Sequence, residues 1–186
     1  MKKAILILGA GPEQVDCYKI ALKKKLICVG VDKNPDSPGF KFTKNQINLS
    51  IYDYKSILNK LKIFKNLKII GLVAVGVDCP QTVIYLSEKI NLNIISRNTQ
   101  NFVINKFKLY NFLKNDFLIP DYLKLGNKIK LKNFLEKNKK PYITKPIDGR
   151  GSREVQYFEN KKNLLSFLSK LKKNKLKKTI IQKFVM

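Results

Sequence analysis

The sequence has no histidine and no tryptophan, and only three cysteines and three arginines among its 186 residues. Without histidine, a Ser-His-Asp triad and histidine acid–base catalysis are excluded. Cys17, Cys28 and Cys79 have neither metal-ligand nor redox-motif spacing. We therefore expect no zinc site, and small buried cysteines in a reducing, cytoplasmic compartment.

Long hydrophobic runs are also absent, and none approaches the length that spans a bilayer. The start, MKKAILILGAGPEQ, has the two lysines and short apolar run of a signal peptide. The run stops at a Gly-x-Gly followed by Pro12 and Glu13, and no small-residue cleavage site follows. We expect a buried first strand and no membrane partner.

Positive charge is in large excess, with a net charge of +25. Of the 38 basic residues three are arginine, so 38 − 3 = 35 are lysine. Lysine, asparagine and isoleucine are all abundant, as expected from AT-rich codons, and the lysines are spread along the chain except for a cluster at 170–178. We expect solvated surface lysines and no nucleic-acid partner, with a basic nucleic-acid-binding module kept as an alternative.

The first hundred residues alternate between strand and helix patterns. Apolar runs predict strands at 3–9, 26–32, 47–50, 67–76 and 92–96. Helices are predicted at 13–25, 53–64 and 79–90, with Asp53 as an N-cap. This alternation predicts an α/β, Rossmann-like parallel sheet with helices on both faces, over residues 1–98.

The second half, residues 99–186, has a different pattern. Helices are predicted at 105–116, 130–138 and 163–171, and strands at 141–147, 153–158 and 179–185, with 119–125 extended. The strands at 141–147 and 153–158 are expected to form a hairpin around a glycine-rich loop.

The first turn has a partial dinucleotide fingerprint. Gly9 and Gly11 follow the first strand, and Asp32 ends the second strand where a ribose-binding acid would lie. The third glycine is replaced by Gln14. A tight turn explains the pattern without a ligand, and a nicotinamide-dependent oxidoreductase remains an alternative.

The glycine-rich loop in KPIDGRGSREV holds two of the three arginines. Its glycines free the backbone to fold over a ligand, and guanidinium groups bind phosphate through two donors at once. Lys145 on the preceding strand projects a further cation. An ordinary hairpin turn with exposed arginines is the simpler alternative. The loop residues are Gly149, Arg150, Gly151, Ser152 and Arg153.

Four stretches in order resemble the ATP-grasp superfamily, in particular ligases similar to the carbamoyl-phosphate synthase large chain and biotin carboxylase. They are ILILGAGPEQ…VGVDKNPDSPGF, VDCPQTVIYLSEKINLNIIS…NKFKLYNFLKNDFLIPDY, PYITKPIDGRGSREVQYF and IIQKFV. The third is similar to that family's lysine strand and lid, with usual wording close to K-P-x-x-G-x-G-S-x-G-V.

The resemblance implies a pre-ATP-grasp domain over 1–98, then linker helices and the lid part of an incomplete, α+β ATP-grasp domain over 99–186. Lys106 and Lys145 would contact phosphates, and residues 149–153 would form the lid. Gln182, Lys183 and Val185 would line the adenine pocket, partly through backbone groups, and the turn at Gly9 and Gly11 would face the acceptor substrate. Glu154 departs from the family, which usually has glycine there.

The resemblance also implies a reaction, in which ATP phosphorylates a small carboxylate and an amine or thiol displaces the phosphate. ATP and Mg²⁺ are the expected cofactors. Residues 160–186 contain no Asp or Glu, so the metal ligands and the C-terminal half of the fold are expected outside this sequence. A truncated, inactive ligase is favoured. A first polypeptide completed by a second, and a non-catalytic remnant, remain open.

Overall fold

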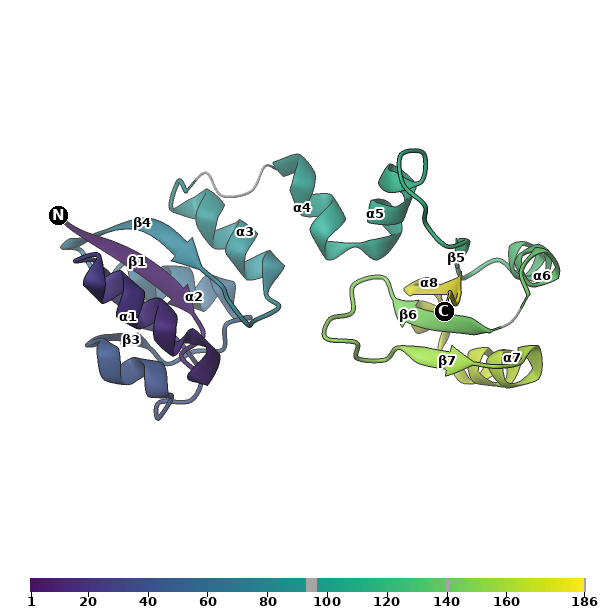
Figure 1. Cartoon of the computed structure of the whole chain (residues 1–186), viewed down its shortest axis with the longest axis horizontal. Helices are drawn as coiled ribbons and strands as arrows, with labels where there is room; N and C mark the ends of the chain where they lie inside the picture. The colour runs from purple at the N-terminus through teal and green to yellow at the C-terminus, as the bar shows by residue number, and fades with distance from the viewer. Residues whose placement is uncertain (93–96, 140, 186) are drawn as a thin grey trace. The chain divides into compact units, whose positions relative to one another are not determined.

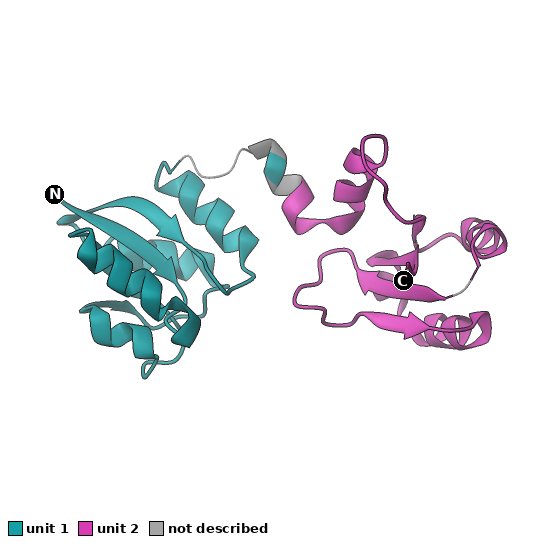
Figure 2. Ribbon diagram, in the orientation of Figure 1, with its two compact units in different colours: residues 1–100 teal, residues 101–186 magenta. Residues whose placement is uncertain are grey.

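The computed structural model describes residues 1–92, 97–139 and 141–185. They form two compact units, residues 1–100 and 101–186 (Figure 2). Each unit has its own sheet and its own core. Most of the strand predicted at 92–96 lies outside the described residues. Within them, no helix is long and apolar enough to cross a membrane.

Unit 1 is built on a four-stranded parallel sheet (Figure 1). Its strands are β1 (Lys2–Leu8), β2 (Ile27–Val31), β3 (Asn45–Ile47) and β4 (Leu67–Val73), in the order β3-β2-β1-β4. Its helices are η1 (Pro12–Gln14), α1 (Val15–Lys23), η2 (Pro38–Phe42), α2 (Tyr54–Leu61) and α3 (Pro80–Lys89), and α4 (Arg97–Ile104) follows. Asp53 caps α2 through Ser56 N at 3.2 Å, as predicted.

Alternate residues of each strand point to opposite faces of this sheet. Both faces are buried, because helices pack on each of them. On one face Leu6, Val29 and Ile47 pack with α2 and α3. On the other, Ile7 and Cys28 pack with α1 and η2. The predicted α/β architecture with helices on both faces is confirmed, and the near-continuous apolar strands are its cause.

Tyr18 of α1 ties the first turn to the sheet. Its side chain is fully buried, and its hydroxyl donates to Gly9 O at 3.1 Å. The Tyr18 side chain leaves room only for glycine at two neighbouring positions: a Cβ at Gly30 would lie 2.4 Å from the Tyr18 hydroxyl, and one at Gly39 2.7 Å from its ring. Burial is the main reason that the pKa of Tyr18 is raised, and Cys28 and Asp32 add to it.

Unit 2 is built on a four-stranded antiparallel sheet in the order β5-β8-β6-β7. The strands are β5 (Tyr122–Lys124), β6 (Tyr142–Pro146), β7 (Gln156–Phe158) and β8 (Thr179–Lys183). The helices are α5 (Lys106–Leu113), α6 (Lys128–Lys137), α7 (Lys161–Lys170) and α8 (Lys173–Lys177). The expected hairpin is confirmed, because β6 and β7 pair antiparallel around the glycine-rich loop.

The two faces of the second sheet differ. Residues 123, 142, 158 and 181 point to one face, where α6, α7 and α8 cover them with leucine and phenylalanine side chains. We call this the helix-covered face. The opposite face carries residues 122, 124, 145 and 182, and Phe107 and Tyr110 of α5 pack there against Tyr122. We call this the α5 face.

One element differs from the sequence prediction. The strand predicted from 153 begins only at Gln156, because Ser152 and Glu154 have φ angles of 55° and 60°, which a strand does not allow. The lysines of the cluster at 170–178 are exposed, as predicted, and the cluster contains the short helix α8, which was not predicted. Leu176 of α8 packs on the core.

We predict that Tyr18→Phe destabilises unit 1 by about 1 kcal/mol near neutral pH, because Gly9 O loses its donor. The burial-raised pKa keeps Tyr18 protonated in the folded state above the ordinary value of about 10. The unfolded chain releases that proton first, so folding stability falls as pH rises above about 10.

Urea unfolding followed by circular dichroism at pH 7 and at about pH 11 tests this. The wild type should lose stability between the two conditions, and Tyr18→Phe should lose less, because it lacks the proton. Tyr157→Phe, at an exposed tyrosine whose ring contact with Phe184 a phenylalanine keeps, is the control and should behave as wild type. Equal losses in wild type and Tyr18→Phe would contradict the interpretation.

Candidate functional site

The first turn is closed over itself by Gln14. Gly9 has a φ of 95°, and a Cβ there would lie 2.9 Å from Gln14 Oε1. The buried Gln14 side chain also donates from Nε2 to Val75 O at 2.6 Å. The residue that replaces the third fingerprint glycine therefore fills the space over Gly9 and Gly11 and links the turn to the segment after β4.

Both carboxylate oxygens of Asp32 accept hydrogen bonds from backbone N–H groups. One carboxylate oxygen accepts from Ala10 N at 2.9 Å, and the other accepts from Asn34 N at 3.0 Å. The acid expected to bind a ribose thus joins the first turn to the loop after β2. Gly39 N donates to Ala10 O at 2.7 Å on the same turn.

The base of the glycine-rich loop, residues 147–155, is held by the start of α5. Asn105 caps α5 by accepting from Lys108 N at 3.0 Å, which makes Lys106 the first residue of the helix. Lys106 N donates to Ile147 O at 2.8 Å, and its Nζ donates to Gly149 O. One of the two predicted phosphate-contacting lysines therefore lies against the predicted lid, although 43 residues separate it from Gly149.

The loop backbone shows why its glycines are needed. A Cβ at Gly149 would lie 2.6 Å from the ring of Pro146, and Gly151 has a φ of 54°. Two weak turns follow, from Arg153 N to Arg150 O at 3.1 Å and from Val155 N to Ser152 O at 3.3 Å. Residues 151–157 are exposed, so this segment has the local character expected of a mobile lid.

Lys145 lies on the α5 face of the sheet. Its half-buried side chain places Nζ 5.2 Å from the ring centroid of Tyr110. In the strand register Lys145 is opposite Ile180, and Gln182 lies two residues further along β8 on the same face. Gln182 is only 5% exposed. The structure thus places these two predicted site residues on one face, beside α5.

The other two predicted residues of β8 and its end lie differently. Lys183 pairs with Tyr142, so its side chain points to the opposite face from Gln182, and it is exposed. Its N–H donates to Asp121 O at 2.9 Å. Val185 follows the strand with 61% of its side chain exposed. Lys183 and Val185 remain predicted contacts through their backbone groups.

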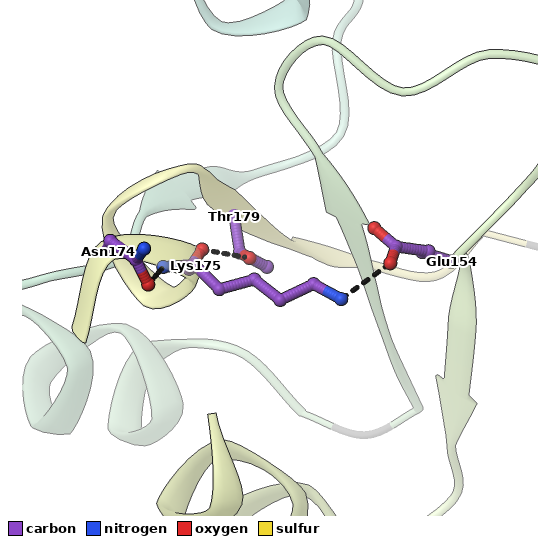
Figure 3. Close-up of polar contacts among 4 residues, drawn as sticks. All are labelled: Glu154, Asn174, Lys175 and Thr179. Atoms are coloured by element: carbon purple, nitrogen blue, oxygen red, sulfur yellow. Dashed lines mark hydrogen bonds and ion pairs between the residues drawn. The ribbon is translucent and has the colours of Figure 1, made fainter. Parts of the chain in front are cut away.

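Two lysines near α8 pair with the acids of the loop, and neither was predicted. Lys178 Nζ lies 3.8 Å from Asp148 Oδ2, and Lys175 Nζ lies 2.5 Å from Glu154 Oε1 (Figure 3). Ile147 N also donates to Lys178 O at 2.8 Å. The sequence does contain a signal for them: antiparallel strands at 141–147 and 179–185 place the chain that leads into the second beside the loop that follows the first.

Two hollows lie on the helix-covered side. One, of about 350 Å³, is lined by Thr144, Glu154 and Lys175 among others. Thr144 Oγ1 is buried there, with no hydrogen-bond partner among the described residues. The other, of about 730 Å³, has a leucine floor and a lysine rim between α6, α7 and α8. Neither is lined by Lys145 or Lys106, and Lys145 points to the opposite, α5 face.

Across residues 1–92, 97–139 and 141–185, no three His, Cys, Asp or Glu side chains lie close enough together to hold a metal ion. The two acids of the loop, Asp148 and Glu154, each pair with a lysine.

Comparison with known proteins tests the predicted resemblance. The family model of the ATP-grasp domain matches residues 103–186, so the resemblance to the ATP-grasp superfamily is confirmed over that part of the chain. A search of curated proteins finds no match. The fold is shared with solved enzyme structures over almost the whole chain.

Three of these structures illustrate the likeness. N5-carboxyaminoimidazole ribonucleotide synthetase from Thermotoga maritima is 24% identical, with a TM-score of 0.66 over 100% of this chain and 46% of its own. The Staphylococcus aureus synthetase complexed with ADP is 17% identical, with a TM-score of 0.71 over 100% and 48%. The biotin carboxylase domain of Hydrogenobacter thermophilus 2-oxoglutarate carboxylase, with MgADP and bicarbonate, is 13% identical, with a TM-score of 0.74 over 99% and 44%. The chain thus spans slightly less than half the length of each.

We predict that Lys106→Met loosens the loop, because Gly149 O loses its charged donor. The measurement is cleavage by an arginine-specific protease, which has only Arg97, Arg150 and Arg153 as targets. Cleavage after Arg150 should accelerate about threefold relative to cleavage after Arg97, since proteolysis follows the population of open forms. Lys114→Met, at the other end of α5, should leave the ratio unchanged. A Lys106→Met ratio equal to the wild-type ratio would show that this contact does not hold the loop.

Proposed function

We propose that this chain is the N-terminal portion of an ATP-dependent carboxylate–amine (or thiol) ligase of the ATP-grasp type, and that unit 2 binds the phosphates of ATP. The loop 147–155 acts as the lid, with Gly149, Gly151 and Ser152 presenting backbone and hydroxyl donors. Arg150 and Arg153 supply guanidinium groups. Lys106 and Lys145 supply two further cations from α5 and β6.

The observation that carries this proposal is the contact of Lys106 with the loop. The first residue of α5 donates through its backbone to Ile147 O and through its ammonium to Gly149 O. A helix N-terminus and a lysine therefore both point to the loop that contains the two arginines. Lys145 leaves the same sheet beside α5, on the face away from Asp148 and Glu154. This separation of cations from carboxylates is what phosphate binding requires.

The reaction that we propose for the complete enzyme proceeds through an acyl phosphate. A carboxylate oxygen attacks the γ-phosphorus of ATP, ADP leaves, and an amine or thiol then attacks the acyl carbon and displaces phosphate. In this chain, the loop arginines and the two lysines would neutralise and orient the triphosphate. We propose that the turn at Gly9 and Gly11 faces the acceptor substrate, and that Gln182, Lys183 and Val185 contact adenine.

We also propose that phosphoryl transfer needs residues beyond these 186, from a longer form of the chain or from a second polypeptide. The structures that it resembles are about twice as long. Mg²⁺ would supply charge neutralisation between the β- and γ-phosphates, and its protein ligands would come from that other part.

The geometry of the first turn does not favour the alternative of a nicotinamide-dependent oxidoreductase. Asp32 uses both carboxylate oxygens on backbone N–H groups, and Gln14 occupies the space over Gly9 and Gly11. A pyrophosphate needs that space, because it binds against the exposed backbone of such a turn.

We predict that Lys145→Ala and Arg150→Ala each weaken ATP binding about tenfold, because each removes a charge-assisted contact to phosphate. Binding is measured by isothermal titration calorimetry with MgATP and with NADH. Lys161→Ala, on α7 beside the hollow of the opposite face, changes the net charge equally and should bind ATP as wild type does. Equal weakening in all three variants would indicate nonspecific attraction to a basic surface, and tighter binding of NADH than of ATP would favour the oxidoreductase.

We predict further that the 186-residue polypeptide binds ATP but does not hydrolyse it. The expected phosphate release equals that of the Lys145→Ala/Arg150→Ala double variant, because binding groups alone do not complete the transfer site. A malachite-green assay over several hours measures it. Release that depends on Lys145 would contradict the proposal that further residues are required.

A further inference from the structure

Glu154 combines an unfavourable backbone conformation with a specific side-chain contact. Its φ of 60° lies in the left-handed region, where a residue with a Cβ is disfavoured by about 1 kcal/mol. Its carboxylate contacts Lys175 Nζ at 2.5 Å. Figure 3 shows the Lys175 side chain extended from α8 towards Glu154. A glycine would adopt the backbone freely but could not make the ion pair.

The Lys175 end of this contact is fixed by its own helix. Lys175 N donates to Asn174 Oδ1 at 2.7 Å, and Lys175 O accepts from the Thr179 hydroxyl at 2.9 Å (Figure 3). Thr179 in turn begins β8, opposite Pro146 at the end of β6. The backbone of Lys175 is therefore bonded to the start of β8, and β8 pairs with β6, the strand that leads into the lid.

The contact also decides on which side of the sheet the carboxylate lies. Glu154 and Lys175 line the same hollow as Thr144, on the helix-covered side. Lys145, the next residue of β6, points to the α5 face. The Glu154 carboxylate is thus held away from the proposed phosphate contacts, where its charge would repel ATP.

We propose that the ion pair between Glu154 and Lys175 is a latch: it restrains the lid loop and keeps the Glu154 carboxylate turned away from the nucleotide. This inference rests on the proposed ATP site. Both residues are positioning residues: neither contacts the nucleotide, and each acts through the conformation of the loop. Asp148, near the start of the loop, forms a similar ion pair with Lys178 at the longer distance of 3.8 Å.

The strength of the latch suits a lid that must open and close. The two side chains are 54% and 55% exposed, so solvent and salt weaken their attraction, as in other surface ion pairs. The pair should shift the population of open loop severalfold without locking it. High ionic strength should release the latch.

The first test measures loop opening without nucleotide, by the arginine-specific protease and the ratio of cleavage after Arg150 to cleavage after Arg97. We expect Lys175→Gln and Glu154→Gln each to raise the ratio about two- to fivefold, and the double variant to raise it no further. High salt should raise the wild-type ratio and leave the variants unchanged. Lys173→Gln, on the same helix but beside the other hollow, is the matched control and should keep the wild-type ratio.

The second test measures ATP affinity by calorimetry on the same four proteins and wild type. Lys175→Gln should weaken binding about threefold, because the released Glu154 carboxylate reaches the phosphates. Glu154→Gln should bind about twofold more tightly than wild type, because that charge is gone. In the Glu154→Gln background, Lys175→Gln should have no further effect. A merely structural role of Lys175 would weaken binding in both backgrounds.

The two tests separate the latch from the proposed function. If wild type binds no ATP, the ligase proposal fails, while the protease ratios still decide whether the latch exists. If the ratios of Lys175→Gln and Glu154→Gln equal that of Lys173→Gln, the latch is absent whatever the ATP affinity. If Lys175→Gln weakens ATP binding equally in the wild-type and the Glu154→Gln backgrounds, then Lys175 does not act by keeping the Glu154 carboxylate away from the phosphates.

Discussion

The antiparallel pairing of β6 with β8 is the constraint on which unit 2 depends. It places Pro146 opposite Thr179 and Lys145 opposite Ile180. The chain that leaves β6 as the lid and the chain that enters β8 from α8 must therefore run side by side. Successive residues of β6 point to opposite faces, so that Thr144 lies on the helix-covered face and Lys145 on the α5 face. One strand pairing thus fixes where the cations, the lid and the acids of the lid lie relative to one another.

In unit 1 the first turn is shaped by close packing and by hydrogen bonds within the chain. Tyr18 leaves no room for a Cβ at Gly30 or Gly39, and Gln14 covers Gly9. Asp32 then joins the turn to the next loop through two backbone donors. A glycine-rich turn after a first strand is therefore compatible with a dinucleotide site and with a self-contained turn, and only the position of the Gln14 side chain distinguishes the two.

Most of the fold could be predicted from sequence because its signals are local. Continuous apolar runs predicted the buried strands, and Asp53 predicted a helix start. The hairpin around the glycine-rich loop could be predicted from the two strand patterns on either side of its glycines. Lys175 and Lys178 were not predicted. In a chain with 35 lysines, the 38 basic residues less three arginines, composition does not separate a paired lysine from a solvated one, and only the antiparallel pairing of β6 with β8 places these two beside the loop. The strand predicted from 153 begins only at Gln156, because Ser152 and Glu154 have positive φ angles that the apolar and polar pattern of the sequence does not reveal.

The proposed function gives the arginines and the lysines of unit 2 different tasks. A guanidinium binds phosphate through two parallel donors, whereas an ammonium acts as a point charge that any nearby carboxylate satisfies. The loop carries its arginines where the exposed backbone turns, and lysines from α5, β6 and α8 surround its base. If the loop closes over phosphate as we propose, its carboxylate must stay away from the nucleotide. The ion pair with Lys175 holds the Glu154 carboxylate on the helix-covered side, so under this proposal glutamate in place of the family glycine is compatible with phosphate binding.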